Sequence, residues 1–257
     1  MFGRLPFLAL CAAVVLTGLA CGTETGGSEP IILLPDPDVG AMLDAGSEGD
    51  ASMEDGGGPA VAATIRIINP MTRGGFAGVT VTGPQGEAVT DATGRATVDV
   101  SPGVYQLTLD APGARRHQLW GAAGDMAFEQ ITYLSPDMIT SYVFGLLGLV
   151  DDPAKGILVV GLDAPNLAPA VGAAATLDVE HGEAFVFGGQ LPTPGQAIPA
   201  GGQGFVTFPN VSPGWVTIDT TFPTGDCRIF PSETEDNQVQ VIAGEVAVVA
   251  FTCRSAP

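Results

Sequence analysis

Basic side chains are scarce in this sequence: 9 Lys and Arg residues stand against 28 Asp and Glu residues, giving a formal net charge of −19. Nucleic-acid phosphates are bound by clusters of Lys and Arg, so this composition excludes a nucleic-acid partner. Histidine is scarcer still, with 2 residues in 257. Because a catalytic nucleophile needs a neighbouring base, a hydrolase is the least expected function, and the sequence predicts no catalytic residue, cofactor or metal site.

Long apolar runs are also lacking beyond the first twenty residues. The most apolar later stretch, residues 123–161, is interrupted by Asp137, Asp151, Asp152 and Lys155. A membrane-spanning helix needs about 20 consecutive apolar residues, so none is predicted there. Long helices are disfavoured too, because the 36 Gly and 21 Pro residues break helix interiors. The chain is therefore predicted to be turn-rich and all-β.

Residues 1–20 have the order of a signal peptide, with Arg4 followed by an uncharged apolar run over residues 5–19. Residues 16–22, Leu-Thr-Gly-Leu-Ala-Cys-Gly, resemble the bacterial lipobox, whose cysteine is diacylated and becomes the mature N-terminus. The resemblance implies a lipid anchor, with palmitate, on Cys21 and a place at the outer membrane or cell surface. Leucine stands second before Cys21, where the lipobox has it third, so conventional cleavage and secretion is the alternative.

Two cysteines remain for the folded part. Cys11 leaves with the signal peptide and Cys21 takes the lipid, which leaves Cys227 and Cys253. Disulfide bonds persist outside the reducing cytosol, so we predict that these two residues pair. A metal or catalytic thiol is the alternative, but the sequence contains no CxxC motif.

Residues 21–60 are acidic and rich in Gly, Ser, Pro and Ala. They contain nine Asp and Glu residues and no Lys or Arg. Such a segment buries no core and repels itself, so we expect a disordered tether that holds the folded part away from the membrane. A calcium loop at residues 44–55 is the alternative, although the acidic residues do not fall in the EF-hand spacing.

From residue 61 the chain alternates short strands with turns. Strands are predicted over residues 64–68, 79–82, 96–100 and 104–109. The segments between them include Gly-Pro-Gln-Gly and Asp-Ala-Thr-Gly, whose glycines take positive φ at little steric cost. Strands of this length and spacing are typical of a β-sandwich.

One block of sequence occurs twice. Val-Ser-Pro-Gly stands at residues 100–103 and again at residues 211–214, 111 residues later. Two further blocks match in the same order, residues 75–81 with 169–175 and residues 94–98 with 203–208. Three aligned blocks indicate two copies of one module. We predict Ig-like or transthyretin-like β-sandwich modules at residues 61–153 and 154–257.

The repeated blocks are similar to a known family. Residues 90–98, Thr-Asp-Ala-Thr-Gly-Arg-Ala-Thr-Val, residues 101–107, Ser-Pro-Gly-Val-Tyr-Gln-Leu, and residues 205–214, Phe-Val-Thr-Phe-Pro-Asn-Val-Ser-Pro-Gly, resemble carboxypeptidase regulatory-like modules. The resemblance implies a transthyretin-like sandwich that acts as a spacer, adhesive or binding unit without catalytic residues. Relatives that hydrolyse 5-hydroxyisourate end in Tyr-Arg-Gly-Ser, whereas this chain ends Cys-Arg-Ser-Ala-Pro. Residues 111–152 are poorly explained by the resemblance.

The one cluster of positive charge lies at residues 115–120, Arg-Arg-His-Gln-Leu-Trp. Arg115, Arg116 and His117 are candidate contacts for a small anion or a glycan, with Trp120 as a stacking face. The alternative is a solvated turn whose tryptophan packs on the sandwich edge.

The second histidine, His181, lies between Glu180 and Glu183. These residue types suit a metal or an acid–base site, but one histidine with two carboxylates is a small set for either. We interpret the segment as a solvated hairpin.

Strand alternation after the Ser-Pro-Gly turn gives a further candidate. Tyr105, Leu107 and Leu109 share one face of their strand, because successive side chains point to opposite faces. The same register in the second copy places Val216, Ile218 and Thr220 inward. It places Trp215 outward with Thr217 and Asp219, on a polar face. An exposed aromatic residue there is suited to stacking on a sugar or contacting a partner, unless a loop or the neighbouring module covers it.

The sequence therefore predicts a non-enzymatic lipoprotein of the cell envelope that acts as a surface binding or adhesion module. Its expected partners are the membrane, through the lipid, and a glycan or an envelope protein. A structural spacer or assembly component of the envelope is the alternative.

Overall fold

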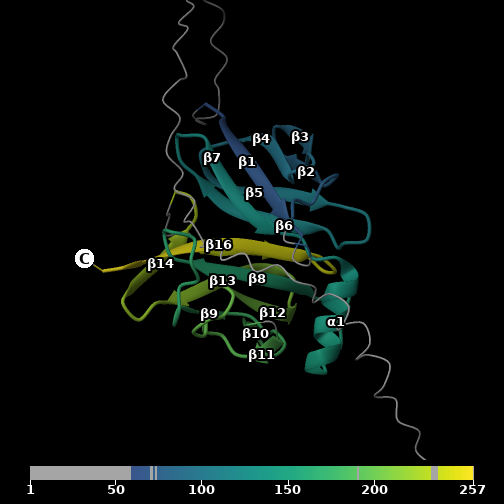
Figure 1. Ribbon diagram of the computed structural model, residues 1–257, viewed down its shortest axis with the longest axis vertical. Helices are drawn as coiled ribbons and strands as arrows, with labels where there is room; N and C mark the ends of the chain where they lie inside the picture. Colours follow the sequence, from purple (N-terminus) through teal and green to yellow (C-terminus); the bar gives the residue numbers. More distant parts are fainter. Residues whose placement is uncertain (1–58, 70–71, 73, 190, 233–236, 257) are drawn as a thin grey trace, which may run out of the picture. The chain divides into compact units, whose positions relative to one another are not determined.

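The computed structural model describes residues 59–69, 72, 74–189, 191–232 and 237–256. The chain divides into two units, Met1–Ser52 and Met53–Pro257, and every described residue belongs to the second unit. The predicted signal peptide, the lipid site at Cys21, the calcium-loop alternative and all but the last two residues of the predicted tether lie outside the described residues. The described part is all-β, with two sandwich modules and one short helix (Figure 1).

The first module is built from two packed sheets. Strand β1 lies between β4, which is antiparallel to it, and β7, which is parallel. In the second sheet β5 lies between β2 and β6, both antiparallel, and β3 continues beyond β2. The strands are β1 (Val61–Ile68), β2 (Thr80–Gly83), β3 (Gly86–Val89), β4 (Arg95–Val100), β5 (Gly103–Asp110), β6 (His117–Ala123) and β7 (Phe128–Tyr133). The predicted strands are confirmed to within three residues at each end.

The second module repeats this topology. Strand β8 lies between antiparallel β12 and parallel β16, as β1 lies between β4 and β7. Strand β13 lies between antiparallel β9 and β15, as β5 lies between β2 and β6. The strands are β8 (Gly156–Asp163), β9 (Ala174–Leu177), β10 (Phe185–Gly188), β11 (Leu191–Pro194), β12 (Phe205–Val211), β13 (Gly214–Thr221), β14 (Gly225–Ile229), β15 (Gln238–Val241) and β16 (Val246–Ser255). The repeat seen in the sequence is therefore a repeat of the fold.

The Ser-Pro-Gly turn connects the two sheets in each copy. Gly103 and Gly214 begin β5 and β13 with φ of 101° and 135°, respectively. An L-residue with a side chain is strained at such angles, so glycine is required at this position in both modules. Inward side chains follow at alternate positions, with Leu107 and Leu109 fully buried in one copy and Val216 fully buried in the other. The predicted register is confirmed.

A single sheet continues from one module into the other. Residues 246–249 of β16 pair in parallel with residues 117–120 of β6, so the order around this joint is β8-β16-β6-β5. Strand β6 faces two cores, with Leu119 and Ala123 in that of the first module and Trp120 in that of the second. The boundary predicted near residue 153 is therefore crossed by hydrogen bonds and by core packing.

The single helix of the described residues, α1 (Asp137–Leu147), falls in the stretch for which no structure was predicted. Gly148 ends it in the left-handed conformation, and its amide bonds the Gly145 carbonyl oxygen. Phe144 packs with Ile157, Phe185 and Val246, so α1 covers residues of β8, β10 and β16. No helix among the described residues is long and apolar enough to cross a membrane.

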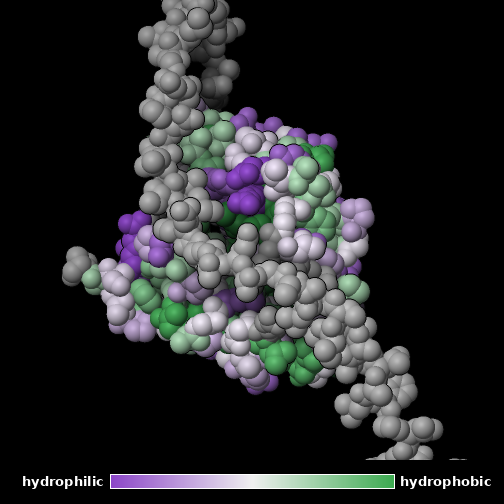
Figure 2. All heavy atoms as spheres, viewed as in Figure 1, coloured by the Kyte–Doolittle hydropathy of each residue, from purple (hydrophilic) through white to green (hydrophobic). Residues whose placement is uncertain are grey.

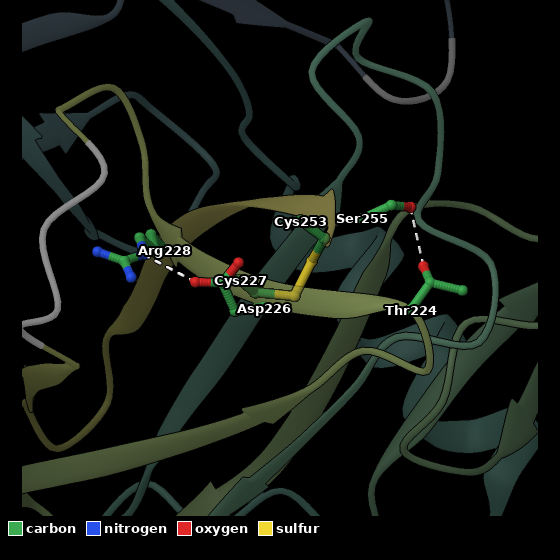
Figure 3. The surroundings of a disulfide bond; sticks show 6 residues. All are labelled: Thr224, Asp226, Cys227, Arg228, Cys253 and Ser255. Carbon is green, nitrogen blue, oxygen red and sulfur yellow. Dashed lines mark hydrogen bonds and ion pairs between the residues drawn. A yellow bond between two sulfur atoms is a disulfide. The ribbon is translucent and has the colours of Figure 1, made fainter. Parts of the chain in front are cut away.

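The predicted disulfide is confirmed. Cys227 of β14 and Cys253 of β16 lie directly opposite each other in antiparallel strands and are covalently joined (Figure 3). Two polar contacts flank the bond, Thr224 with Ser255 at 2.9 Å and Arg228 with Asp226 at 2.9 Å. The bond fixes β14 to the last strand, beside the core of the second module.

Candidate binding surface

The basic segment at residues 115–120 is neutralised by carboxylates. Arg115 donates to both oxygens of Asp151, the Nη1–Oδ1 distance being 3.1 Å, and its Nε lies 3.9 Å from Asp137. Arg116 lies 3.6 Å from both Asp110 and Glu245. Since each guanidinium already faces two carboxylates, this segment offers no excess positive charge to an anion.

The remaining candidates of that segment are buried in strand β6, not exposed in a turn. His117 is 2% exposed and Trp120 is 5% exposed. The His117 Nδ1 atom lies 2.8 Å from the Arg115 carbonyl oxygen, and burial lowers the pKa of His117 to about 4, so the ring is neutral at pH 7. The expectation of a solvated turn is corrected: pairing on both sides with β5 and β16 makes this segment an interior strand.

His181 is half-buried in the loop between β9 and β10. Its Nδ1 atom lies 2.6 Å from the Gly182 carbonyl oxygen, and its ring meets Phe208 edge-on at 5.0 Å. It lines a shallow depression of about 430 Å³ together with Glu183 and Gln196. Among the described residues no three His, Cys, Asp or Glu side chains gather in a way that could hold a metal ion.

Trp215 is exposed, as strand alternation predicts. It follows Gly214 at the start of β13, and 61% of its surface is accessible. Its neighbours Val216 and Ile218 are buried at 0% and 1%, so the strand divides cleanly into an inner and an outer face.

One side of the Trp215 ring is held by Trp120. The two ring centroids are 5.6 Å apart and the planes meet at 67°, an edge-to-face arrangement. Trp120 belongs to β6 and Trp215 to β13, so the contact joins the two modules. The buried Nε1 atom of Trp120 has no hydrogen-bond partner among the described residues, so its ring serves here as an apolar contact. Trp215 is thus positioned by Trp120 on one side, while 61% of its surface stays accessible.

Polar side chains surround Trp215 on the outer face of the sheet β15-β13-β9. Directly opposite residues of paired strands share a face, which places Gln240 beside Trp215, Gln238 beside Thr217, and Thr176 beside Asp219. We call these six residues the β13 face. At its border the Asp178 carboxylate accepts a hydrogen bond from the Thr217 amide at 2.9 Å, which lowers the pKa of Asp178. The β13 face therefore combines one indole with amide, hydroxyl and carboxylate groups.

A second exposed apolar feature was not predicted. Met138, Tyr142 and Leu146 are 70%, 65% and 50% exposed and follow one another every four residues on α1. Leu191 of β11, a strand that α1 contacts, is 65% exposed. Figure 2 shows hydrophobic residues at the surface beside the place of β11 in Figure 1. The four-residue spacing was present in the sequence and is a recognised signal of a helix face.

No protein-family model and no curated protein matches this chain. Among solved structures, it is similar to the minor pilin GBS52 of Streptococcus agalactiae, with 12% identity over 76% of this chain and 96% of the other, and a TM-score of 0.26. The major pilin subunit of Bacillus cereus gives 10% identity over 77% and 100%, with a TM-score of 0.26. The Bacillus anthracis TIE protein gives 12% identity and a TM-score of 0.24, and the chain spans only 34% of its length. Because the TM-scores are this low, these likenesses assign no function, and the function proposed for this chain rests on its own residues.

Proposed function

We propose that this chain is a non-enzymatic protein of the cell envelope, exported and lipid-anchored at Cys21, that binds a glycan on the β13 face. The observation that carries the proposal is the 61% exposure of Trp215 on a face that is otherwise polar. Large aromatic side chains are mostly buried, so an exposed and positioned indole indicates a contact that the described residues do not supply.

The chemistry of the β13 face suits a sugar. A sugar ring has apolar C–H groups on its faces and hydroxyl groups at its rim. An indole ring packs on the apolar face, while Gln240, Thr217 and Asp219 offer donors and acceptors for the hydroxyls. The contact with Trp120 restrains Trp215 before binding, so less side-chain freedom is lost when the ligand docks.

The negative charge of the β13 face favours a neutral glycan over an acidic one. The six residues of the β13 face include Asp219 and no Lys or Arg, and Asp178 lies at the border. Like charges disfavour association, so polymers rich in carboxylate, sulfate or phosphate are repelled from this face. Neutral hexose or N-acetylhexosamine polymers fit the site best.

Glycan-array binding by the purified chain tests this function. Trp215→Ala is expected to weaken binding to the retained glycans by roughly 10- to 100-fold, the usual loss when a central aromatic contact is removed. Trp215→Phe should keep part of the affinity, because a smaller ring still stacks. Tyr133→Ala removes an aromatic residue that is 50% exposed in the other module and serves as the matched control. Binding by Trp215→Ala at wild-type strength would contradict the proposal.

A spacer role is the second candidate, and one observation favours it. The parallel ladder between β6 and β16 fastens the two modules to each other. A spacer needs such a fixed connection in order to maintain a distance. A spacer needs no ligand, so an array on which the wild-type chain retains no glycan supports this candidate over the first.

The lipid anchor has its own test. Radiolabelled palmitate should be incorporated into the wild-type protein and not into Cys21→Ala. The lipobox resemblance implies that the acylation sites are the Cys21 thiol and the Cys21 amino group, which cleavage of the signal peptide exposes. If the wild type also fails to take up label, the protein is secreted by conventional cleavage.

A further inference from the structure

The first and last strands of each module are neighbours and run in the same direction. In the first module, residues 63–68 of β1 pair with residues 128–133 of β7. In the second module, residues 157–163 of β8 pair with residues 246–252 of β16. The two parallel ladders occupy equivalent places in the repeated topology, so this arrangement is a property of the module.

Parallel pairing determines how a module responds when its two ends are pulled apart. Tension draws β1 toward its N-terminal end and β7 toward its C-terminal end. Because the strands are parallel, they must slide past each other, and all the hydrogen bonds of the ladder are loaded together. An antiparallel pair held at one end would instead open one hydrogen bond at a time.

We propose that each module is a tension-bearing element whose first and last strands resist extension in shear. This mechanical role goes beyond glycan binding. Its place in the cell rests on the proposed function, since force between a lipid at Cys21 and a ligand at Trp215 enters the first module through β1. The resistance itself depends only on the ladders.

The orientation of the hydrogen bonds in the first module follows from one contact. The Leu134 amide donates to the Ile68 carbonyl oxygen at 3.4 Å. In a parallel ladder the amides of alternate residues point to the same neighbour, so the Thr132 amide points toward β1 and the Ile131 amide points away from it. Strand β7 ends its sheet among the described residues, so the Ile131 amide is not part of the β1 ladder.

Single-molecule pulling on the full chain tests the proposal by comparing two directions. Tags at the two chain ends load the ladders in shear. Tags at the N-terminus and at Ser101 instead load the β1–β4 pair, in which Val61 lies opposite Val100 in antiparallel register, so that pair opens from one end. We expect the first module to unfold at a several-fold higher force with end tags than with the Ser101 tag at the same pulling speed. Equal forces in the two directions would overturn the proposal.

The disulfide identifies which module unfolds in each event. Cys227 and Cys253 are 26 residues apart in the sequence, and the segment between them cannot be stretched until the bond is reduced. Reduction should therefore lengthen the event of the second module by about 90 Å, from about 3.5 Å per residue, and leave the event of the first module unchanged.

Two proline variants localise the resistance to the ladder. Thr132→Pro removes an amide that points toward β1, whereas Ile131→Pro removes one that points away. The unfolding force of the first module should fall in Thr132→Pro and remain closer to wild type in Ile131→Pro. Equal losses in the two variants would contradict the role of the ladder. If Thr132→Pro prevents the module from folding, the comparison of the two pulling directions still decides the proposal on the unaltered sequence.

Discussion

Asp163 lies at a place in the fold that disfavours the charged form of its side chain. It ends β8 and is half-buried, and its carboxylate forms no hydrogen bond or ion pair with another described residue. A Cβ atom on Gly204 would lie 2.2 Å from its Oδ1 atom, so glycine is required where the two segments meet. Burial raises the pKa of Asp163 to about 7, because the charged form loses its hydration.

The raised pKa predicts a pH dependence of stability. In the unfolded chain an Asp has a pKa of about 3.9, so between about pH 4 and pH 7 folding requires the unfolded carboxylate to take up a proton. Stability from this group is therefore present below pH 4 and is lost as the pH rises through 7, by up to about 4 kcal/mol. Urea unfolding at pH 5 and pH 8 should show that Asp163→Asn stabilises the protein more at pH 8 than at pH 5.

A second titrating group acts in the opposite direction. Burial lowers the pKa of His117, so protonation favours unfolding and His117 reduces stability as the pH falls below about 6.5. The comparison must therefore be made between wild type and Asp163→Asn at each pH, since His117 contributes equally to both. An Asp163→Asn effect that does not change between the two pH values would show that Asp163 ionises normally in the folded protein.

At the scale of single elements, the sequence predicts those strands that bury one face. Residues 95–100 and 103–110 alternate between apolar and polar side chains, and they form β4 and β5. Strand β6 is buried at all seven positions, because it lies between two cores, and so it shows no alternation. Helix α1 exposes apolar side chains, and its sequence alone does not say which face packs on the sheet.

Of the candidate site, too, the sequence predicts only the part that follows from local strand alternation. The outward direction of Trp215 follows from the register of β13 after its turn. Its contact with Trp120 does not, because that contact depends on the parallel joint between β6 and β16, which no local pattern specifies. The salt bridges of Arg115 and Arg116 also depend on residues brought together by the fold.

Because β6 packs in both cores, we predict that the stability of the first module depends on the second. A chain of residues 59–153 leaves the Trp120 side of β6 uncovered, although in the whole protein that side packs in the second core. Losing this burial costs roughly 2 kcal/mol or more, so the fragment should melt roughly 10 °C below the same module in the full chain. Thermal unfolding followed by circular dichroism measures this, and equal melting temperatures would mean that β6 is stable without its neighbour.

The same fragment with Trp120→Gln should aggregate less than the parent fragment, because its uncovered face is less apolar.

At the scale of the whole molecule, charge and apolar surface are unevenly distributed. Residues 21–60 carry nine acidic residues without a base, while residues 61–257 carry 19 acidic and 8 basic residues. Several of the basic residues are paired with carboxylates on the surface, and such exposed pairs add little stability. The net charge therefore favours solubility and keeps acidic polymers away, which is consistent with a neutral ligand.

Titration with a glycan retained on the array, followed through the signals of the two tryptophans, tests most directly whether the β13 face binds it. With ¹⁵N-labelled tryptophan the chain gives two indole signals, one from Trp120 and one from Trp215, and Trp120→Phe assigns them. We predict that the Trp215 signal shifts saturably with the affinity measured for binding, while the buried Trp120 signal shifts less. Saturable glycan binding that leaves the Trp215 signal unmoved would contradict the assignment of the β13 face as the binding site.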